Sequence, residues 1–414
     1  MRHVKLLIAF LVVSFYISAL LVDRAAGVIF GVLLLLSLIL LVSSRQSDSE
    51  SFGGLVKQYW LLGLAMCGPL IAVFANQVGS NHFVARTYDS PFRLAMFSLI
   101  FWLFSFLPIK YMRYVQWGWV IGALLSAVKI YDLTYGGVIR YGDDFIPIII
   151  FAEMALLLGM FATLSIAWDT HHDKLIILLK ISALFAGLYA AYLSQSRGVW
   201  MTIPVFLFIA GLAAKNISFR YKFYLIIFFV AILGSISYFG NIVKTRMSGA
   251  ENDISQYSMG ENVDTSLGIR LQLWRGSWVL FKEHPVFGVG VENFPKALTE
   301  LAERKIITPV SATFPHSHNE ILFVMSRLGT FGLLAILGLY FIPVYYFFRE
   351  IRHNDSEVRC TAAMGLSLCL GFFTLGLVDV VFLWWEIFPY YVISIAFFLS
   401  YIIKRKKEVT VSLS

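Results

Sequence analysis

The chain has 414 residues, of which 59% are hydrophobic and only 14% charged, against roughly 45–50% and about 25% in soluble domains. One globular core cannot bury so much apolar surface, so the composition excludes a soluble domain and predicts an all-α polytopic membrane protein. The net charge of +8 comes from short basic clusters between apolar runs rather than from one basic face, which excludes a nucleic-acid-binding protein.

Twelve apolar runs approach the roughly 20 residues that a helix needs to cross a bilayer. The first run follows Arg2 and Lys5, as in a signal peptide, but a second run comes at once without a cleavage site, so we expect the first helix to be retained. The runs are 6–22, 25–42, 60–76, 94–109, 117–131, 146–168, 175–193, 199–213, 223–240, 321–347, 361–381 and 384–403.

Basic residues predict the orientation of these helices. With both termini in the cytoplasm, most Lys and Arg residues fall on the cytoplasmic side, including the run 404–407, as the positive-inside rule requires. Residues 1–240 then form helices one to nine, 241–318 a large periplasmic loop, 319–403 helices ten to twelve and 404–414 a cytoplasmic tail. This is the topology of a multi-pass protein of the bacterial inner membrane. The short loops on the outer side carry few cations, namely Arg24, Arg86, Arg93, Arg140 and Arg197.

The large loop changes character along its length. Residues 247–265 are polar, whereas Leu271, Trp274, Trp278 and Phe281 recur at spacings of three and four and predict an amphipathic helix. Pro285 is expected to end this helix, and the glycines at 288 and 290 to turn the chain. Such a helix typically lies in the membrane interface or across the end of a bundle.

Arginines mark two candidate anion sites. Arg197 follows the seventh predicted helix, and Arg270 and Arg275 begin the loop helix. A guanidinium offers a fixed fork of donors that matches phosphate oxygens. The same residues also fit a plainer interpretation, in which Arg197 extends to lipid head groups and the other two solvate an exposed helix face. The residues alone leave both alternatives open.

A third candidate site, Pro-His-Ser-His-Asn-Glu, precedes the tenth predicted helix. The spacing of His316 and His318 is compatible with a metal, but Glu320 is the one acidic residue beside them, so we expect no metal. A histidine there also suits a general base, and a structural histidine is the default alternative. Walker A, dinucleotide-binding and nucleophile-elbow motifs are absent, which indicates no cofactor and an energy-rich substrate already in the membrane.

His318-Asn319, nine residues, Gly329, two residues and Gly332 resemble the pattern of the O-antigen ligase family, within a wider ligase and polymerase superfamily. Other stretches are similar to the same family, the last more weakly: 195–197, 266–270, 285–290, 376–379 and 89–93.

The resemblance, which covers about 197–379, implies a glycosyltransferase. Its donor would be a glycan on undecaprenyl diphosphate, and its acceptor a sugar hydroxyl of lipid A–core at the periplasmic face. It further implies a base at His318 and diphosphate contacts at Arg197 and Arg270. A neutral histidine would accept the hydroxyl proton, and the arginines would stabilise the leaving diphosphate, so an inverting displacement would need no metal. Further substrate-binding candidates are Arg93, Arg275, His316, Asn319 and Asp379.

Other functions remain open at this point. An O-antigen polymerase uses the same donor with a glycan acceptor, and a protein O-oligosaccharyltransferase usually carries a longer C-terminal region. A lipid-linked glycan transporter or flippase is an alternative of another class, although transporters tend to show repeats and broken helices at the midplane. Here the polar residues gather at one face, which favours an enzyme among membrane lipids. The acceptor sugar, the glycan and the oligomeric state are not specified by the sequence.

Overall fold

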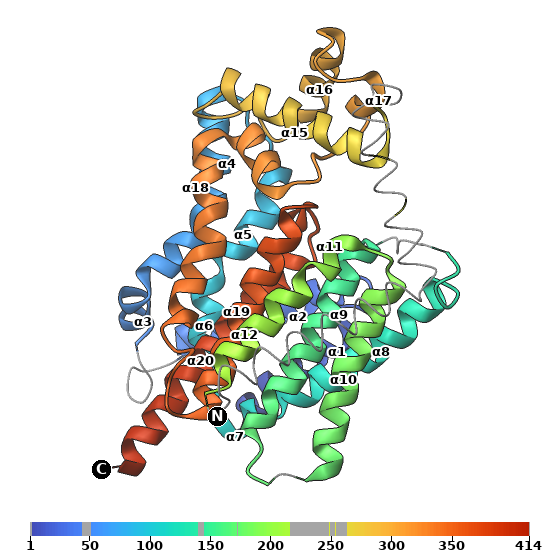
Figure 1. Cartoon of the computed structure of the whole chain (residues 1–414). Helices are drawn as coiled ribbons and strands as arrows, with labels where there is room; N and C mark the ends of the chain where they lie inside the picture. Colours follow the sequence, from blue (N-terminus) through green and yellow to red (C-terminus); the bar gives the residue numbers. More distant parts are fainter. Residues whose placement is uncertain are drawn as a thin grey trace.

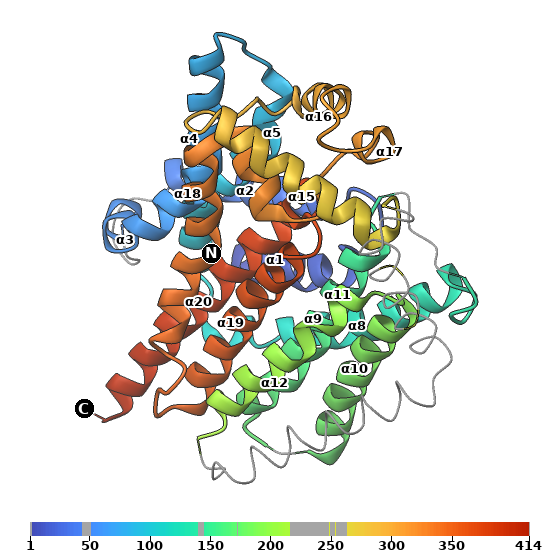
Figure 2. The same ribbon diagram turned by 45° about the horizontal axis from the view of Figure 1, so that its top comes forward.

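Helices form every regular element in the part of the chain that the structure describes, as the composition predicts (Figures 1 and 2). The structure is a computed structural model that describes residues 2–43, 51–139, 145–171, 173–215, 248, 253 and 263–413. The predicted helix at 223–240, most of the polar stretch 247–265 and Arg140 lie outside these residues.

Seven of the described helices are long and apolar enough to cross a membrane, so the protein is a multi-pass membrane protein. All seven coincide with predicted runs, while the expected total of twelve stays a prediction. They are α2 (Ala25–Ser43), α4 (Trp60–Ser80), α9 (Ile148–Leu164) with η2 (Ser165–Trp168), α10 (Lys174–Leu193), α18 (Glu320–Phe348), α19 (Ser356–Gly376) and α20 (Ile387–Leu413).

The predicted run 94–109 is divided among short helices instead of forming one long helix. Met96, with φ −74° and ψ 0°, separates the first two of them. Pro108, with an extended ψ of 149°, caps the third helix, and a proline disfavours helix in the residue before it, so the second helix cannot continue into the third. The segment consists of α5 (Asp89–Ala95), α6 (Phe97–Phe104) and α7 (Ile109–Met112).

The remaining helices of the bundle pack around a buried centre formed by α9, α19 and α20. Close helix contacts depend on small residues: a Cβ added at Gly159 of α9 would lie 2.5 Å from the carbonyl oxygen of Ala183 in α10. The surrounding elements are α1 (Arg2–Ser18), α3 (Phe52–Gln58), η1 (Ala85–Tyr88), α8 (Val115–Leu133), α11 (Arg197–Trp200), α12 (Thr202–Ala213) and η3 (Val381–Leu383).

The predicted loop helix is α15 (Ser266–Glu283), which lies across one end of the bundle, here called the loop end (Figure 1). Its cap, Thr265, accepts a hydrogen bond from the N–H of Gly268, and the helix stops just before Pro285, as expected. Two shorter helices accompany it, α16 (Phe294–Glu303) and α17 (Pro309–Ala312).

A small separate core holds α15 in place. Leu273 and Leu280 of α15 pack with Leu298 and Leu301 of α16 and with Phe323 of α18. The aromatic residues that predicted the helix lie elsewhere on it, and Trp278 is half exposed. The face of α15 that contacts the protein therefore carries leucines and small residues, and the aromatic residues that predicted the helix do not form its buried side.

A kink in α18 attaches the turn after α15 to the bundle. Gly329 has φ 62° and ψ −150°, a conformation that only glycine adopts readily. The kink frees the carbonyl oxygens of Ser326 and Arg327, which accept hydrogen bonds from the N–H groups of Val289 (3.0 Å) and Gly290 (2.9 Å). Gly329 is thus required by backbone geometry.

We expect Gly329→Ala to destabilise the protein by roughly 1–3 kcal/mol for the backbone conformation alone. The added Cβ would also lie 2.3 Å from the carbonyl oxygen of Val286, so the turn must move. Thermal unfolding followed by tryptophan fluorescence measures the change in Tm. Gly338→Ala is the control, because a Cβ there meets its nearest atom, in Ile342, at 3.6 Å. Equal Tm values for the two variants would contradict the role of the kink.

Candidate active site

Asn319 joins the start of α18 to the end of α19. Its side-chain oxygen accepts a hydrogen bond from the N–H of Leu322 (3.0 Å), which caps α18, and its amide donates to the carbonyl oxygen of Leu377 (3.0 Å). The predicted substrate-binding residue Asn319 therefore acts on the protein itself. His318, just before it, has a left-handed φ of 49°, a strained conformation of the kind often held at functional sites.

Glu320 makes the second connection between these segments. Its carboxylate is buried and accepts hydrogen bonds from the N–H groups of Val381 and Phe382 (2.9 Å for Phe382). This carboxylate holds the chain after Asp379 and is not part of the group that the two histidines form. As a result, Asp379 rather than Glu320 is the carboxylate beside the two histidines.

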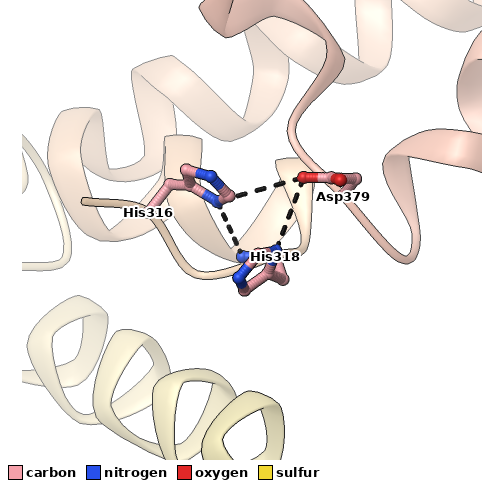
Figure 3. A group of neighbouring side chains, drawn as sticks. All are labelled: His316, His318 and Asp379. Carbon is pink, nitrogen blue, oxygen red and sulfur yellow. Dashed lines mark hydrogen bonds and ion pairs between the residues drawn. The ribbon is translucent and has the colours of Figure 1, made fainter. Parts of the chain in front are cut away.

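The three side chains form a compact cluster (Figure 3). His318 Nδ1 lies 3.5 Å from Asp379 Oδ1, and His316 Nδ1 lies 4.0 Å from the same oxygen. The backbone N–H of His318 donates to His316 Nδ1 at 3.3 Å. Asp379 thus contacts both imidazoles, while His316 also supports the backbone of His318.

The local charges set the protonation of this cluster. Burial raises the pKa of Asp379, but its contact with His318, the charges of both histidines and the N–H of Val380 together hold that pKa below its usual range. Burial, with His318 and Arg270, lowers the pKa of His316 to about 4, although Asp379 opposes this. At neutral pH the carboxylate is therefore ionised and His316 is uncharged.

Arg270 and Arg197, two of the predicted anion-binding residues, are close enough to interact through their charges. Burial lowers the pKa of Arg270, the charge of Asp379 opposes this, and the positive charge of Arg197 lowers it further. Arg270 is in the first turn of α15, and Arg197 begins α11. The fold therefore brings Arg270 close to the carboxylate of the cluster, and Arg197, distant in sequence, close to Arg270.

Arg275 and Arg93 lie apart from this group. Arg275 is on the exposed face of α15 and forms no ion pair among the described residues. Arg93 pairs with Asp89 at 3.0 Å, and its guanidinium lies 5.6 Å from the ring centroid of Trp385. No described contact joins either arginine to the histidines.

Arg327 is a residue that the sequence reasoning missed. It lies on α18 two to three turns beyond the histidines, with its guanidinium 4.3 Å from the ring centroid of Phe323. Its Nε donates to the carbonyl oxygen of Val291 at 3.2 Å. The available signal was a charged residue inside an apolar run, which in membrane helices indicates function by default.

The cluster resembles a metal site only in part. One ligand atom from each of His316, His318 and Asp379 lies within 4.8 Å of the others. However, the lone pair of His316 Nδ1 already accepts the N–H of His318, and the nearby cation Arg270 opposes a further positive charge. The arrangement fits a proton acceptor oriented by a carboxylate better than a cation site.

We therefore expect the purified protein, incubated with Zn²⁺ and desalted, to retain well below one equivalent of zinc. Mass-spectrometric metal analysis of the wild type and of Asp379→Asn measures this, and both should give the same low value. One equivalent in the wild type that disappears in Asp379→Asn would show that the cluster is a metal centre.

The comparison with known proteins agrees with the sequence motifs. A family model described as O-antigen ligase matches residues 182–337, a stretch that includes Arg197, Arg270 and both histidines. An uncharacterized protein of Haemophilus influenzae is 25% identical over 312 residues, which cover 72% of this chain and 74% of that protein. Residues 182–337 of the chain are thus similar to the O-antigen ligase family, as the sequence motifs indicate.

Proposed function

We propose that this protein is an O-antigen ligase that transfers a glycan from undecaprenyl diphosphate to a sugar hydroxyl of lipid A–core. The observation that carries the proposal is the cluster of His318, His316 and Asp379 with Arg270 beside it and Arg197 in turn beside Arg270. A base and two cations are the groups that this transfer needs.

His318 is proposed to be the base. The carboxylate of Asp379, 3.5 Å from Nδ1, orients the imidazole so that Nε2 accepts the proton of the acceptor hydroxyl. The hydroxyl oxygen then forms a bond to the anomeric carbon as the bond from that carbon to the diphosphate breaks. The diphosphate leaves with the electron pair, and the anomeric configuration inverts.

Arg197 and Arg270 are proposed to bind the diphosphate. Two fixed guanidinium forks stabilise the charge that develops on the leaving group, and their effect is strongest where water is excluded. Arg270, in the first turn of the loop helix, is partly buried, which favours such an effect. In this account α15 is a lid, with Trp274 and Trp278 toward lipid or the undecaprenyl chain.

The loop end is proposed to face the periplasm. Cations gather at the opposite end of the bundle, where α20 ends in Figure 1. There Arg405 pairs with Asp355 at 2.9 Å and Lys406 with Glu350 at 2.7 Å. A basic end of this kind is typical of the cytoplasmic side of an inner-membrane protein.

We expect His318→Ala to lower transfer by about 10²-fold or more, because the hydroxyl loses its proton acceptor. The assay contains the purified protein, lipid-linked donor and lipid A–core in EDTA without ATP, with donor binding as the folding control. His316→Ala should be milder, since its ring supports the His318 backbone rather than meeting the hydroxyl. Normal transfer by His318→Ala would disprove the base assignment.

Arg197→Lys and Arg270→Lys should each be nearly as harmful as the alanine variants, with transfer lowered by about 10²-fold. A lysine supplies a point charge but not the fork that matches a diphosphate. Transfer is measured at matched expression, with Arg275→Lys as the matched control on the exposed face of α15. Near-wild-type activity in both lysine variants would contradict diphosphate binding and would indicate that these arginines contact only lipid head groups and solvent.

A further inference from the structure

A cavity of about 710 Å³ lies between α4, α5, α18 and η3. Charged residues line part of it, including Arg86 and Arg327, whereas Ile336 and Leu339 form apolar wall. These two residues are about three turns further along α18 than Arg327, away from the loop end. Asp89, Glu292 and Glu320 line the same part, so it is a region of mixed charge. Such a region beside an apolar wall matches an amphiphile whose polar end, toward the loop end, carries an anionic group for the arginines.

Arg327 is the anchor that such an anion would use. Its Nε is engaged by Val291, and no carboxylate among the described residues lies within 4.0 Å of its guanidinium. Glu320 also lines the cavity, but its carboxylate binds the backbone of η3. The charge of Glu320 acts on Arg327 without a direct ion pair. A buried guanidinium without a direct partner is costly, so an anionic ligand would stabilise it.

The cavity lies next to the segments that carry the candidate active site. Its wall includes Glu320, two residues after His318, and Phe382 and Leu383, which follow Asp379. In Figures 1 and 2, α4 and α5 lie on one side of the connection between α19 and α20, and α11, which carries Arg197, lies on the other. The cavity and the proposed diphosphate site therefore flank the cluster.

A groove on α2 and α5 lies beside the cavity. Asp89 and Trp385 line both the cavity and a groove of about 560 Å³ along α2 and α5. Apolar residues and glycines of α2 form one wall of this groove, and Arg24 and Arg93 are also in its lining. Arg93, which contacts both shared residues, lies at the boundary between the groove and the cavity.

We propose that this cavity binds the acceptor glycolipid, with an acidic group of the acceptor, a phosphate in lipid A–core, on Arg327. The inference rests on the proposed function. In an inverting displacement the attacking hydroxyl approaches the anomeric carbon opposite the leaving group. With the donor diphosphate at Arg197 and Arg270, the acceptor comes from the cavity side, where the cation and the apolar wall match its phosphate and acyl chains.

The test measures the KM of each substrate in nanodiscs for Arg327→Gln. The acceptor KM should rise about 10-fold or more, as expected for the loss of a charged hydrogen bond, while the donor KM stays unchanged. With a dephosphorylated acceptor, the acceptor KM of the wild type should rise to that of Arg327→Gln. The acceptor KM of the variant should not change. Arg86→Gln, at an exposed position, should change the acceptor KM in the same direction, and Lys296→Gln, an exposed cation of α16, should change neither KM.

A binding measurement separates this proposal from the proposed function. Native mass spectrometry of lipid A–core on the protein without donor should give weaker binding to Arg327→Gln than to the wild type, even if no transfer is detected. Absence of transfer by the wild type would contradict the ligase function alone. A changed donor KM in Arg327→Gln would overturn the acceptor site. So would an unchanged acceptor KM in this variant together with phosphatidylglycerol that competes with lipid A–core equally well for both proteins.

Discussion

The candidate site depends on the attachment of α18 to the end of α19. Asn319 and Glu320, the first residues after the two histidines, bind Leu377 on one side and Val381 with Phe382 on the other. These contacts enclose the position of Asp379, so its carboxylate has little freedom to leave the imidazoles. Because the contacts are made to backbone groups, the geometry depends little on which side chains surround Asp379.

The same attachment explains why the site can combine a base with strong cations. A buried carboxylate beside a histidine keeps the imidazole oriented, and burial strengthens every interaction with a developing charge. Arg270 approaches from α15, which is itself held by its own small core and by the turn at the kink of α18. The end of the bundle and the separately anchored helix α15 thus meet at the carboxylate of Asp379.

Periodicity and composition predicted the helices, because a helix that crosses lipid must satisfy its own backbone and remain apolar. The loop helix, its end before Pro285 and the family pattern around His318 were also visible in the sequence. The pairing of Asp379 with the histidines was not, since no local rule joins a residue after α19 to one before α18. For the same reason Glu320 was considered as a metal ligand, although it holds the backbone of η3.

Arg327 and the divided run 94–109 are further features that local sequence patterns did not predict. An arginine in an apolar helix has the same appearance in sequence whether it faces a cavity or lipid, and only packing against α4 and η3 distinguishes these cases. Likewise, an apolar run gives no sign that Met96 and Pro108 divide it. In both cases the structure depends on tertiary contacts, which the periodicity of the sequence does not specify.

The most direct test of the ligase assignment is the lipopolysaccharide of a bacterial strain that lacks this gene. The account predicts lipid A–core without any O-antigen, together with long glycan chains retained on undecaprenyl diphosphate. Lipid A–core that carries single glycan units would instead indicate a polymerase, and normal long-chain lipopolysaccharide would contradict the account.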